Sequence, residues 1–348
     1  MARIHIMDGR DRNPALERIA LVESDYFNSK IIITGGLGFI GSNLARRLVA
    51  LGADVTLVDS LIPAYGGNRF NIHDIEKEVH VNISDVRDAA SLEQLVQGKD
   101  YLFNLAGQTS HLDSMEDPFT DLEINCQAQL SILEVCRKVN PSIKIVFAST
   151  RQLYGRPDYL PVDEKHLLRP VDVNGINKMA GEWYHILYNN VYDIRSSSLR
   201  LTNTIGPGMR IKDARQTFVG IWIRRLLEGR DFEVWGGEQL RDFNHVGDVV
   251  DAFLLAATNE KAHGEIFNLG SAPPVSLRHV AELLIKIHGS GHYEIKKYPD
   301  DRKRIDIGDY YGNYGHIKET LGWEPRTTLA DSLSCTLDYY RRNMEHYL

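Results

Sequence analysis

A glycine-rich turn between a strand pattern and a helix pattern restricts the fold of this chain more than any other stretch. Residues 30–34 read KIIIT, a short β-branched run typical of a strand that is buried on both faces. Residues 34–41 read TGGLGFIG, and the helical pattern FIGSNLARRLVALG begins inside that turn. A glycine turn that joins a buried strand to a helix predicts a βαβ unit in a parallel sheet.

Further strand and helix patterns alternate through the first half of the chain. Helical stretches are expected near 88–97 and 117–139, and they separate the strand-like runs. We therefore predict an α/β fold with a doubly wound parallel sheet of the Rossmann type. The predicted strands after the first are DVTLVD (54–59), HVNIS (80–84), DYLFNLA (100–106) and IKIVFAS (143–149).

The glycine turn also predicts a dinucleotide site. Gly35 would allow the tight turn, Gly38 would let a pyrophosphate approach, and Gly41 would let the helix pack on the strand. Asp59 ends the next strand, where it would accept hydrogen bonds from the ribose and repel a 2′-phosphate, which favours NAD over NADP. The cofactor residues expected in this region are Gly35, Gly38, Phe39, Ile40, Gly41 and Asp59.

The pattern changes near residue 200, which suggests three segments. Residues 1–28 are expected to form an N-terminal extension, and 29–200 the NAD-binding Rossmann domain. Residues 201–348 are expected to form mainly a smaller α/β domain for the substrate, interleaved with the first.

Composition limits the compartment and the partners. The 348 residues carry 40 basic and 47 acidic side chains, a net charge of −7 that argues against a nucleic-acid binder. No apolar run suits a signal peptide or a membrane span. The three cysteines show no zinc or disulfide spacing, so we expect a cytoplasmic protein without a metal site.

Several later motifs occur in the order of a known family. SDVRD (84–88), NLAGQTSHLDSMEDP (104–118), EINCQAQLSILEVC (123–136) and FASTRQLYG (147–155) follow the GxxGxxG turn. Together they resemble the extended short-chain dehydrogenase/reductase superfamily, in its branch of nucleotide-sugar epimerases, dehydratases and decarboxylases. The resemblance implies a nucleotide-diphospho-sugar substrate and adenine contacts from Asp85 and Val86.

The same resemblance implies a catalytic group with one altered member. The family places a Ser or Thr, a Tyr and a Lys around the nicotinamide, and these positions fall on Thr150, Asn174 and Lys178. Asn174 can hydrogen-bond a sugar hydroxyl but cannot take its proton. Asparagine also caps helices well, so a capping role for Asn174 at the start of its helix stays open.

Another group would then have to move the proton. His111 is the first candidate, because it follows the fourth strand in the loop where the family lines its substrate pocket, and a histidine titrates near neutrality. A structural role for this lone histidine stays open, and Asp113 and Tyr154 are weaker candidates. The family's 4,6-dehydratases carry an acidic pair after the Ser or Thr, whereas this chain has Arg151 and Gln152, which disfavours a standard dehydratase.

The C-terminal motifs resemble the family's diphosphate-binding segments. LRLTNTIGPG (199–208) implies that Asn203 contacts the diphosphate, and GGEQLRDFNHVGDVVDAF (236–253) implies that Arg241 binds it. The tail motif implies Arg304 as a second arginine ligand, next to Arg302.

Three functions remain open at this stage. The first is an NAD-dependent epimerase that oxidises and re-reduces C4 of a nucleotide-sugar with an unusual acid/base set. The others are a regulatory protein that binds NAD and nucleotide-sugar without turnover, and a dehydratase or decarboxylase. The resemblance also implies a homodimer, paired through the helices expected at 117–139 and 174–190.

Overall fold

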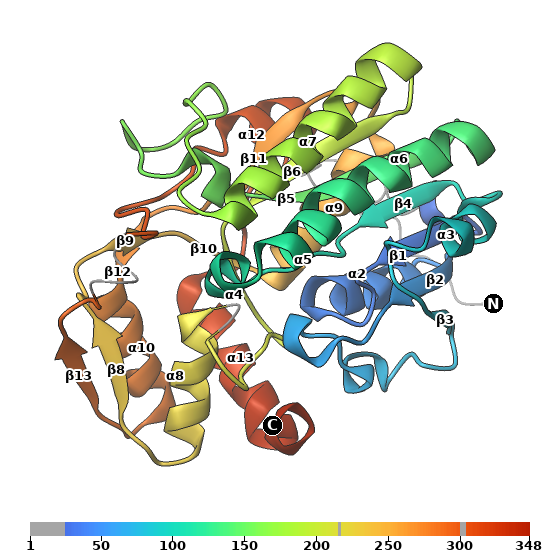
Figure 1. Cartoon of the computed structure of the whole chain (residues 1–348). Helices are drawn as coiled ribbons and strands as arrows, with labels where there is room; N and C mark the ends of the chain where they lie inside the picture. The colour runs from blue at the N-terminus through green and yellow to red at the C-terminus, as the bar shows by residue number, and fades with distance from the viewer. Residues whose placement is uncertain (1–24, 215–216, 300–303) are drawn as a thin grey trace, which may run out of the picture.

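A seven-stranded, wholly parallel sheet runs through the centre of the molecule (Figure 1), a computed structural model that describes residues 25–214, 217–299 and 304–348. The strand order is β11-β6-β5-β4-β1-β2-β3, which confirms the doubly wound fold. The strands are β1 (Lys30–Thr34), β2 (Asp54–Asp59), β3 (Val79–Ile83), β4 (Tyr101–Asn104), β5 (Lys144–Thr150), β6 (Ser196–Leu201) and β11 (Ile266–Asn268).

The central strands are buried because both of their faces are covered. Ile31, Ile32 and Ile33 of β1 have no exposed surface, and Ile32 lies level with Thr56 of β2 and Leu102 of β4. A β-branched run without alternation therefore reports a strand in the middle of the sheet.

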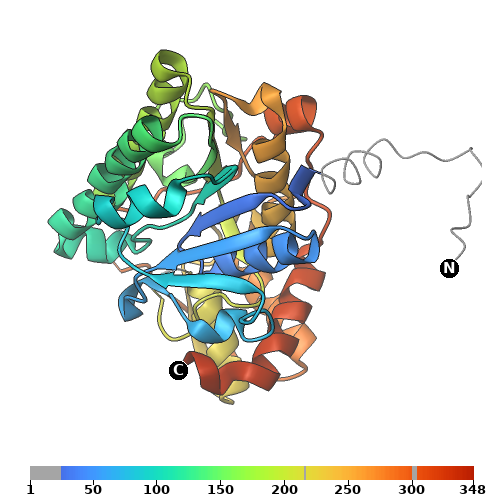
Figure 2. The same cartoon turned by 90° about the vertical axis from the view of Figure 1, so that its right-hand side faces the viewer.

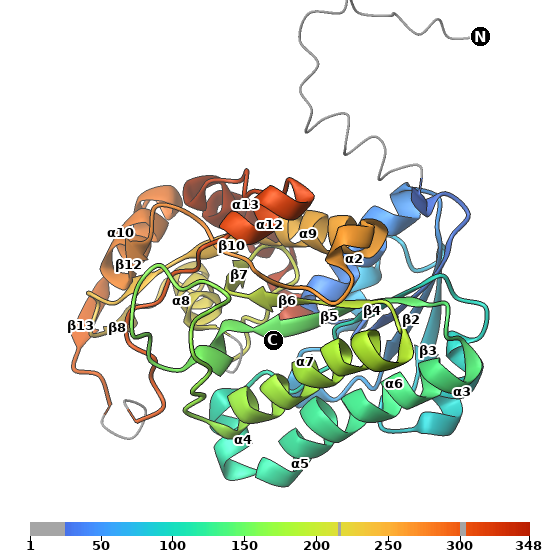
Figure 3. The same cartoon turned by 90° about the horizontal axis from the view of Figure 1, so that it is seen from above.

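Helices form a layer on each face of the sheet. α3, α6 and α7 cover one face, and α2, α9 and α12 cover the other, as two turned views show (Figures 2 and 3). These helices span α2 (Phe39–Ala50), α3 (Ala89–Val96), α6 (Ala128–Val139), α7 (Val173–Tyr192), α9 (Val246–Thr258) and α12 (Gly315–Leu321).

A second lobe beyond the carboxyl ends of the strands has its own apolar core, around Val219, Ile223 and Leu284. It is formed by α8 (Phe218–Leu227), α10 (Leu277–His288) and α13 (Leu329–Asn343), with three two-stranded sheets. β11 returns from this half of the chain to the main sheet. The small strands are β7 (Asn203–Ile205), β8 (Phe232–Trp235), β9 (Leu240–Arg241), β10 (Phe243–His245), β12 (Val275–Ser276) and β13 (Tyr293–Lys296).

The helix predicted over 117–139 is interrupted. It consists of α5 (Pro118–Leu122), a π-helical turn over Glu123–Gln127, and α6. Gln129 donates from Nε2 to the Ile124 carbonyl at 3.0 Å and accepts from Asn104 of β4, so tertiary contacts hold the wider turn. A short helix, α4 (His111–Glu116), precedes α5.

Short 3₁₀ turns complete the connections, at Pro63–Tyr65, Arg69–Ile72, Arg151–Tyr154 (η4), Glu260–Ala262 and Met344–Tyr347. Of the extension predicted over 1–28, all but residues 25–28 lies outside the described residues. Within the described part of the chain, no helix is long and apolar enough to span a membrane.

Candidate active site

The glycine turn brings α2 close against β1. Gly35 has a φ of +68°, in the left-handed region that favours glycine. A Cβ on Gly41 would lie 2.3 Å from the Gly35 carbonyl oxygen, so a side chain there would push the helix off the strand. No acidic residue stands in the first turn of α2, which leaves the helix N-terminus free to face a phosphate.

Asp59 stands at the end of β2, facing this turn. Its Oδ2 accepts from the Leu37 N–H at 3.0 Å and its Oδ1 from the Leu61 N–H at 2.8 Å. Burial raises the pKa of Asp59, and these two hydrogen bonds oppose the rise. Each carboxylate oxygen keeps a further lone pair for a ribose hydroxyl.

A first cavity of ≈ 290 Å³ starts at this turn and continues to α7. Asp85 and Val86 line it as predicted from the sequence, and an ion pair with Arg87 at 2.7 Å lowers the pKa of Asp85. The open helix N-terminus and the inward-facing Asp59 fit NAD. All the cofactor positions expected from the sequence line this cavity, namely Gly35, Gly38, Phe39, Ile40, Gly41, Asp59, Asp85, Val86 and Lys178.

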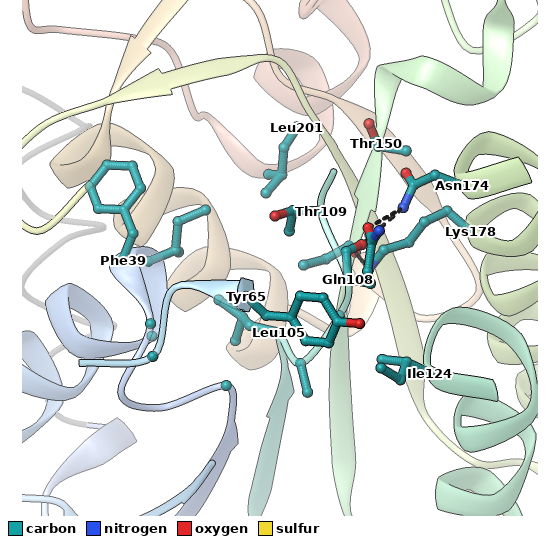
Figure 4. Close-up of a pocket in the computed structure, with 18 of the residues that line it drawn as sticks. Phe39, Tyr65, Leu105, Gln108, Thr109, Ile124, Thr150, Asn174, Lys178 and Leu201 are labelled. Carbon is teal, nitrogen blue, oxygen red and sulfur yellow. Dashed lines mark hydrogen bonds between the residues drawn. The ribbon is translucent and has the colours of Figure 1, made fainter. Parts of the chain in front are cut away.

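Lys178 reaches the far end of this cavity from α7 (Figure 4). Its Nζ donates to the Ala148 carbonyl at 3.1 Å and lies 4.9 Å from the centre of the Phe147 ring. Burial lowers the pKa of Lys178 to about 8, against an opposing effect of the Asp121 carboxylate. Thr150, at the end of β5, lines the same wall.

Asn174 does not cap its helix, so the capping role is wrong. Asp172 is the N-cap of α7, and its Oδ1 accepts from the Gly175 N–H at 2.7 Å. Asp172 and Asn174 are both residue types that cap helices, and they stand two positions apart. The structure places Asn174 inside the first turn, where its side chain faces the cavity.

Two acceptors fix the orientation of the Asn174 amide. Its Nδ2 donates to the Gln108 carbonyl at 2.9 Å and to Asp121 Oδ2 at 3.0 Å (Figure 4 shows the contacts with Gln108). Both partners only accept, so the NH₂ group must face them. Asp121 is fully buried and also accepts hydrogen bonds from the side-chain amides of Asn125 and Asn177, at 3.0 and 2.8 Å. No donor among the described residues reaches Oδ1, the side-chain oxygen of Asn174, so this atom is left as an acceptor for a ligand.

His111 lies at the start of α4 and not in a loop, because Ser110 caps a short helix there. Its Nδ1 stands 3.0 Å from Oδ2 of Asp172, whose side chain is fully buried. Burial raises the pKa of Asp172, but contacts with His111, Gly175 and Gln152 outweigh it and the net shift is downward. The Asp172 carboxylate therefore lies directly behind the His111 ring.

The other two candidates for the base stand away from the cavity. Tyr154 is fully buried, donates to Asn268 Oδ1 at 2.7 Å and accepts from Arg200, which pairs with Glu182 at 2.6 Å. Burial raises the pKa of Tyr154 well above its ordinary value. Neither Tyr154 nor Asp113 lines the cavity.

A second cavity of ≈ 590 Å³ adjoins the first, and His111, Arg151, Gln152, Asn203 and Thr217 line both. Arg241 lines the second cavity, with its guanidinium 3.4 Å from Asp306. Burial lowers the pKa of Arg241.

Arg304, predicted as the second arginine ligand, is exposed and lines neither cavity. At this part of the wall the chain presents Ile305, Asp306 and Ile307 instead, and Arg225 of α8 supplies a further arginine. Arg302 lies outside the described residues.

Arg225, Tyr65 and Gln108 are among the lining residues that the sequence analysis did not single out. Arg225 lies in a helical pattern that gave no sign of a ligand role. Tyr65, from the turn after β2, and Gln108 both line the first cavity (Figure 4). The described residues contain no group of three or more metal-ligating side chains.

Known proteins resemble this chain over most of its length. The sequence pattern of the NAD dependent epimerase/dehydratase family matches residues 31–270. A Methanocaldococcus jannaschii protein, named as a candidate UDP-glucose 4-epimerase, is 34% identical over 90% of this chain and 99% of its own length. UDP-glucuronic acid decarboxylase 1 of Xenopus tropicalis is 30% identical over 93% of this chain and 75% of its own.

A solved structure extends the likeness to three dimensions. The crystal structure of UDP-glucose 4-epimerase from Thermotoga maritima, with UDP-glucose, superposes with a TM-score of 0.82. It is 29% identical in sequence, over 90% of this chain and 99% of that one.

Proposed function

The chain belongs to the NAD dependent epimerase/dehydratase family, and on that basis we propose that it is an epimerase that inverts C4 of a nucleotide-diphospho-sugar through a 4-keto intermediate. One observation carries this proposal. Thr150, Asn174 and Lys178 line the end of the first cavity, where it meets a second cavity lined by Asn203 and Arg241.

Each residue of this group has a task that its geometry supports. When bound, NAD would supply the acceptor for a hydride from C4 of the sugar and the donor for its return. Thr150 holds the C4 oxygen, and the Lys178 ammonium binds the cofactor ribose and places a positive charge beside the reacting group. The Asn174 carbonyl oxygen accepts a hydrogen bond from a sugar hydroxyl.

The proton of the C4 hydroxyl needs an acceptor, and we assign it to His111. The buried Asp172 carboxylate lies 3.0 Å from Nδ1, which leaves Nε2 as the ring nitrogen to face the sugar. The proton therefore leaves the C4 oxygen for Nε2 during oxidation and returns from it during reduction. General base catalysis of this kind is worth roughly 10²–10⁴-fold in rate.

The diphosphate lies in the second cavity in this proposal. Arg241 and Asn203 bind it, as their motifs imply, and Arg225 replaces Arg304 as the second arginine. A planar guanidinium suits phosphate oxygens better than an ammonium does.

A homodimer is also proposed, through α7 and α5. Ile176, Trp183, Leu187 and Val191 recur along one side of α7 and are each about half exposed. Phe119 of α5 is 74% exposed. A contiguous apolar face of this kind suggests a protein interface.

The three cysteines form no disulfide, which supports a reducing compartment such as the cytoplasm.

Two other functions are distinguished by one experiment. The purified protein is mixed with UDP-, dTDP-, GDP- and CDP-sugars, and the absorbance of reduced nicotinamide and the NMR spectrum of the sugar are followed. A 4-epimer together with transient reduced nicotinamide supports the epimerase. Binding without any hydrogen transfer would favour the regulatory protein, and loss of water or CO₂ would favour a dehydratase or decarboxylase.

A further inference from the structure

Arg151 occupies the wall between the two cavities. It is the first residue of η4 and follows Thr150 directly at the end of β5. Its side chain lines the first cavity near the proposed reacting carbon and also the second cavity. None of the roles assigned above uses it.

The partners of this guanidinium are neutral groups. It donates to Thr202 Oγ1 and to Asn203 Oδ1, each at 3.3 Å, and lies 5.2 Å from the centre of the Tyr310 ring. Among the described residues, no carboxylate lies within ion-pair distance. Asp242 is reached only indirectly, because the Thr202 hydroxyl donates to it.

Two arginines that are buried in the described part of the chain each have a carboxylate partner. Arg200 pairs with Glu182 at 2.6 Å, and Arg241 with Asp306 at 3.4 Å. Burial lowers the pKa of Arg151 to about 10, the like charge of Arg241 adds to that effect, and the Asp242 and Asp306 carboxylates oppose it. Because Arg151 is only partly exposed and forms no ion pair among the described residues, a ligand group that brings a negative charge would be stabilised here.

The position of Arg151 indicates which part of a ligand would carry that charge. Arg241 and Arg225 line only the second cavity, where the diphosphate is expected, whereas Arg151 also lines the first. We propose, on the basis of the proposed function, that the sugar of the substrate is a hexuronic acid and that Arg151 binds its carboxylate. A planar carboxylate matches the paired N–H donors of a guanidinium.

The test compares three ligands on the NAD-containing protein. Binding of UDP-glucuronate, UDP-glucose and UDP is measured by calorimetry for the wild type and for Arg151→Gln. We expect the wild type to bind UDP-glucuronate about 10-fold or more tightly than UDP-glucose, since a charge-assisted hydrogen-bond pair is worth that much. Arg151→Gln should remove this preference and leave UDP binding within about 3-fold.

Two further variants test whether a loss of the preference for UDP-glucuronate reflects Arg151 itself or general damage to the protein. Arg151→Lys keeps the positive charge but not the paired N–H donors of the guanidinium, so it should retain part of the preference that Arg151→Gln loses. Arg169→Gln changes an arginine that is 60% exposed and lines neither cavity, and it should behave as the wild type. The NAD content of each preparation reports whether the variant is folded.

The remaining outcomes would overturn the inference. Equal weakening of all three ligands by Arg151→Gln would make Arg151 a diphosphate ligand. Equal binding of both sugars by the wild type would show that the site does not select an acid. If no nucleotide-sugar in the wider panel binds at all, the proposed function itself fails.

Discussion

Asn174 shows how far a single residue can be interpreted from sequence. Its spacing from Lys178 located the helix and the altered position. Its orientation could not be predicted, because it depends on Asp121, a carboxylate 53 residues away that is fully buried by the fold. The sequence left capping and ligand contact as alternatives, and the Asp172 cap removed the first.

His111 is the residue on which the proposed proton transfer depends. His111→Asn keeps an N–H donor near Asp172 but removes the titratable ring, so kcat for epimerisation should fall by roughly 10²–10⁴-fold. Asp172→Asn keeps a good helix cap while removing the charge, and it should cause a smaller fall. Steady-state kinetics with unchanged NAD content would check both, and a His111→Asn enzyme of full activity would exclude this base.

The lowered pKa of Lys178 predicts that the stability of the fold depends on pH. Its pKa is about 8 in the folded protein, below the ordinary value of 10.5, so the unfolded chain binds more protons between those values. The cost of burying Lys178 is therefore fully present below pH 8 and is relieved as the pH rises toward 10.5.

The comparison with Lys178→Met isolates this effect. The free energy of unfolding of the cofactor-free wild type, minus that of the variant, should increase between pH 8 and pH 10. Urea unfolding at several pH values measures the difference, and a difference that is flat or falls with pH would contradict the shifted pKa.

At the scale of elements, β1 and β2 have the bounds that their apolar runs predicted, Lys30–Thr34 and Asp54–Asp59. Local composition was sufficient there because strands buried on both faces are apolar throughout. The π-helical turn at Glu123–Gln127 was not predictable, since Gln129, which bonds to it, is itself held by Asn104 from another part of the chain.

The contact between β1 and α2 gives a prediction at this scale. Gly41→Ala would place a Cβ 2.3 Å from the Gly35 carbonyl oxygen, so the purified variant should lose its bound NAD. Gly98→Ala is a matched control, since it has a φ of +65° and no atom within 4 Å of an added Cβ. It should cost about 1 kcal/mol of stability, because alanine is strained at this φ, yet retain NAD. Retention of NAD by Gly41→Ala would contradict the tight packing of this turn.

The whole molecule brings together groups that the sequence could not connect. Motif order predicted that Asn203 and Arg241 face the substrate, and both line the second cavity. Arg304 is exposed and lines neither cavity, because a motif far along the chain cannot show which side chain turns inward. Arg225 lines the second cavity because of the way α8 packs in the second lobe, and the sequence of α8 alone does not determine that packing.

The exposed apolar side of α7 predicts the state of assembly. Trp183→Glu together with Leu187→Glu should convert a dimer into a monomer, because charges would replace two side chains that are about half exposed. Leu167→Glu, at an apolar residue that is 57% exposed outside α7, is the control and should leave the dimer intact. Light scattering measures the mass, and an unchanged mass in the double variant would place the interface elsewhere.

Epimerisation at C4 within one site is the central claim, and isotope labelling tests it most directly. A nucleotide-sugar deuterated at C4 is incubated with the enzyme in ordinary water, and the products are analysed by NMR. We predict both C4 epimers, each with deuterium still at C4, because the hydride that leaves C4 would stay on the bound cofactor and return to the same carbon. The absence of a C4 epimer, or an epimer with hydrogen at C4, would contradict the account.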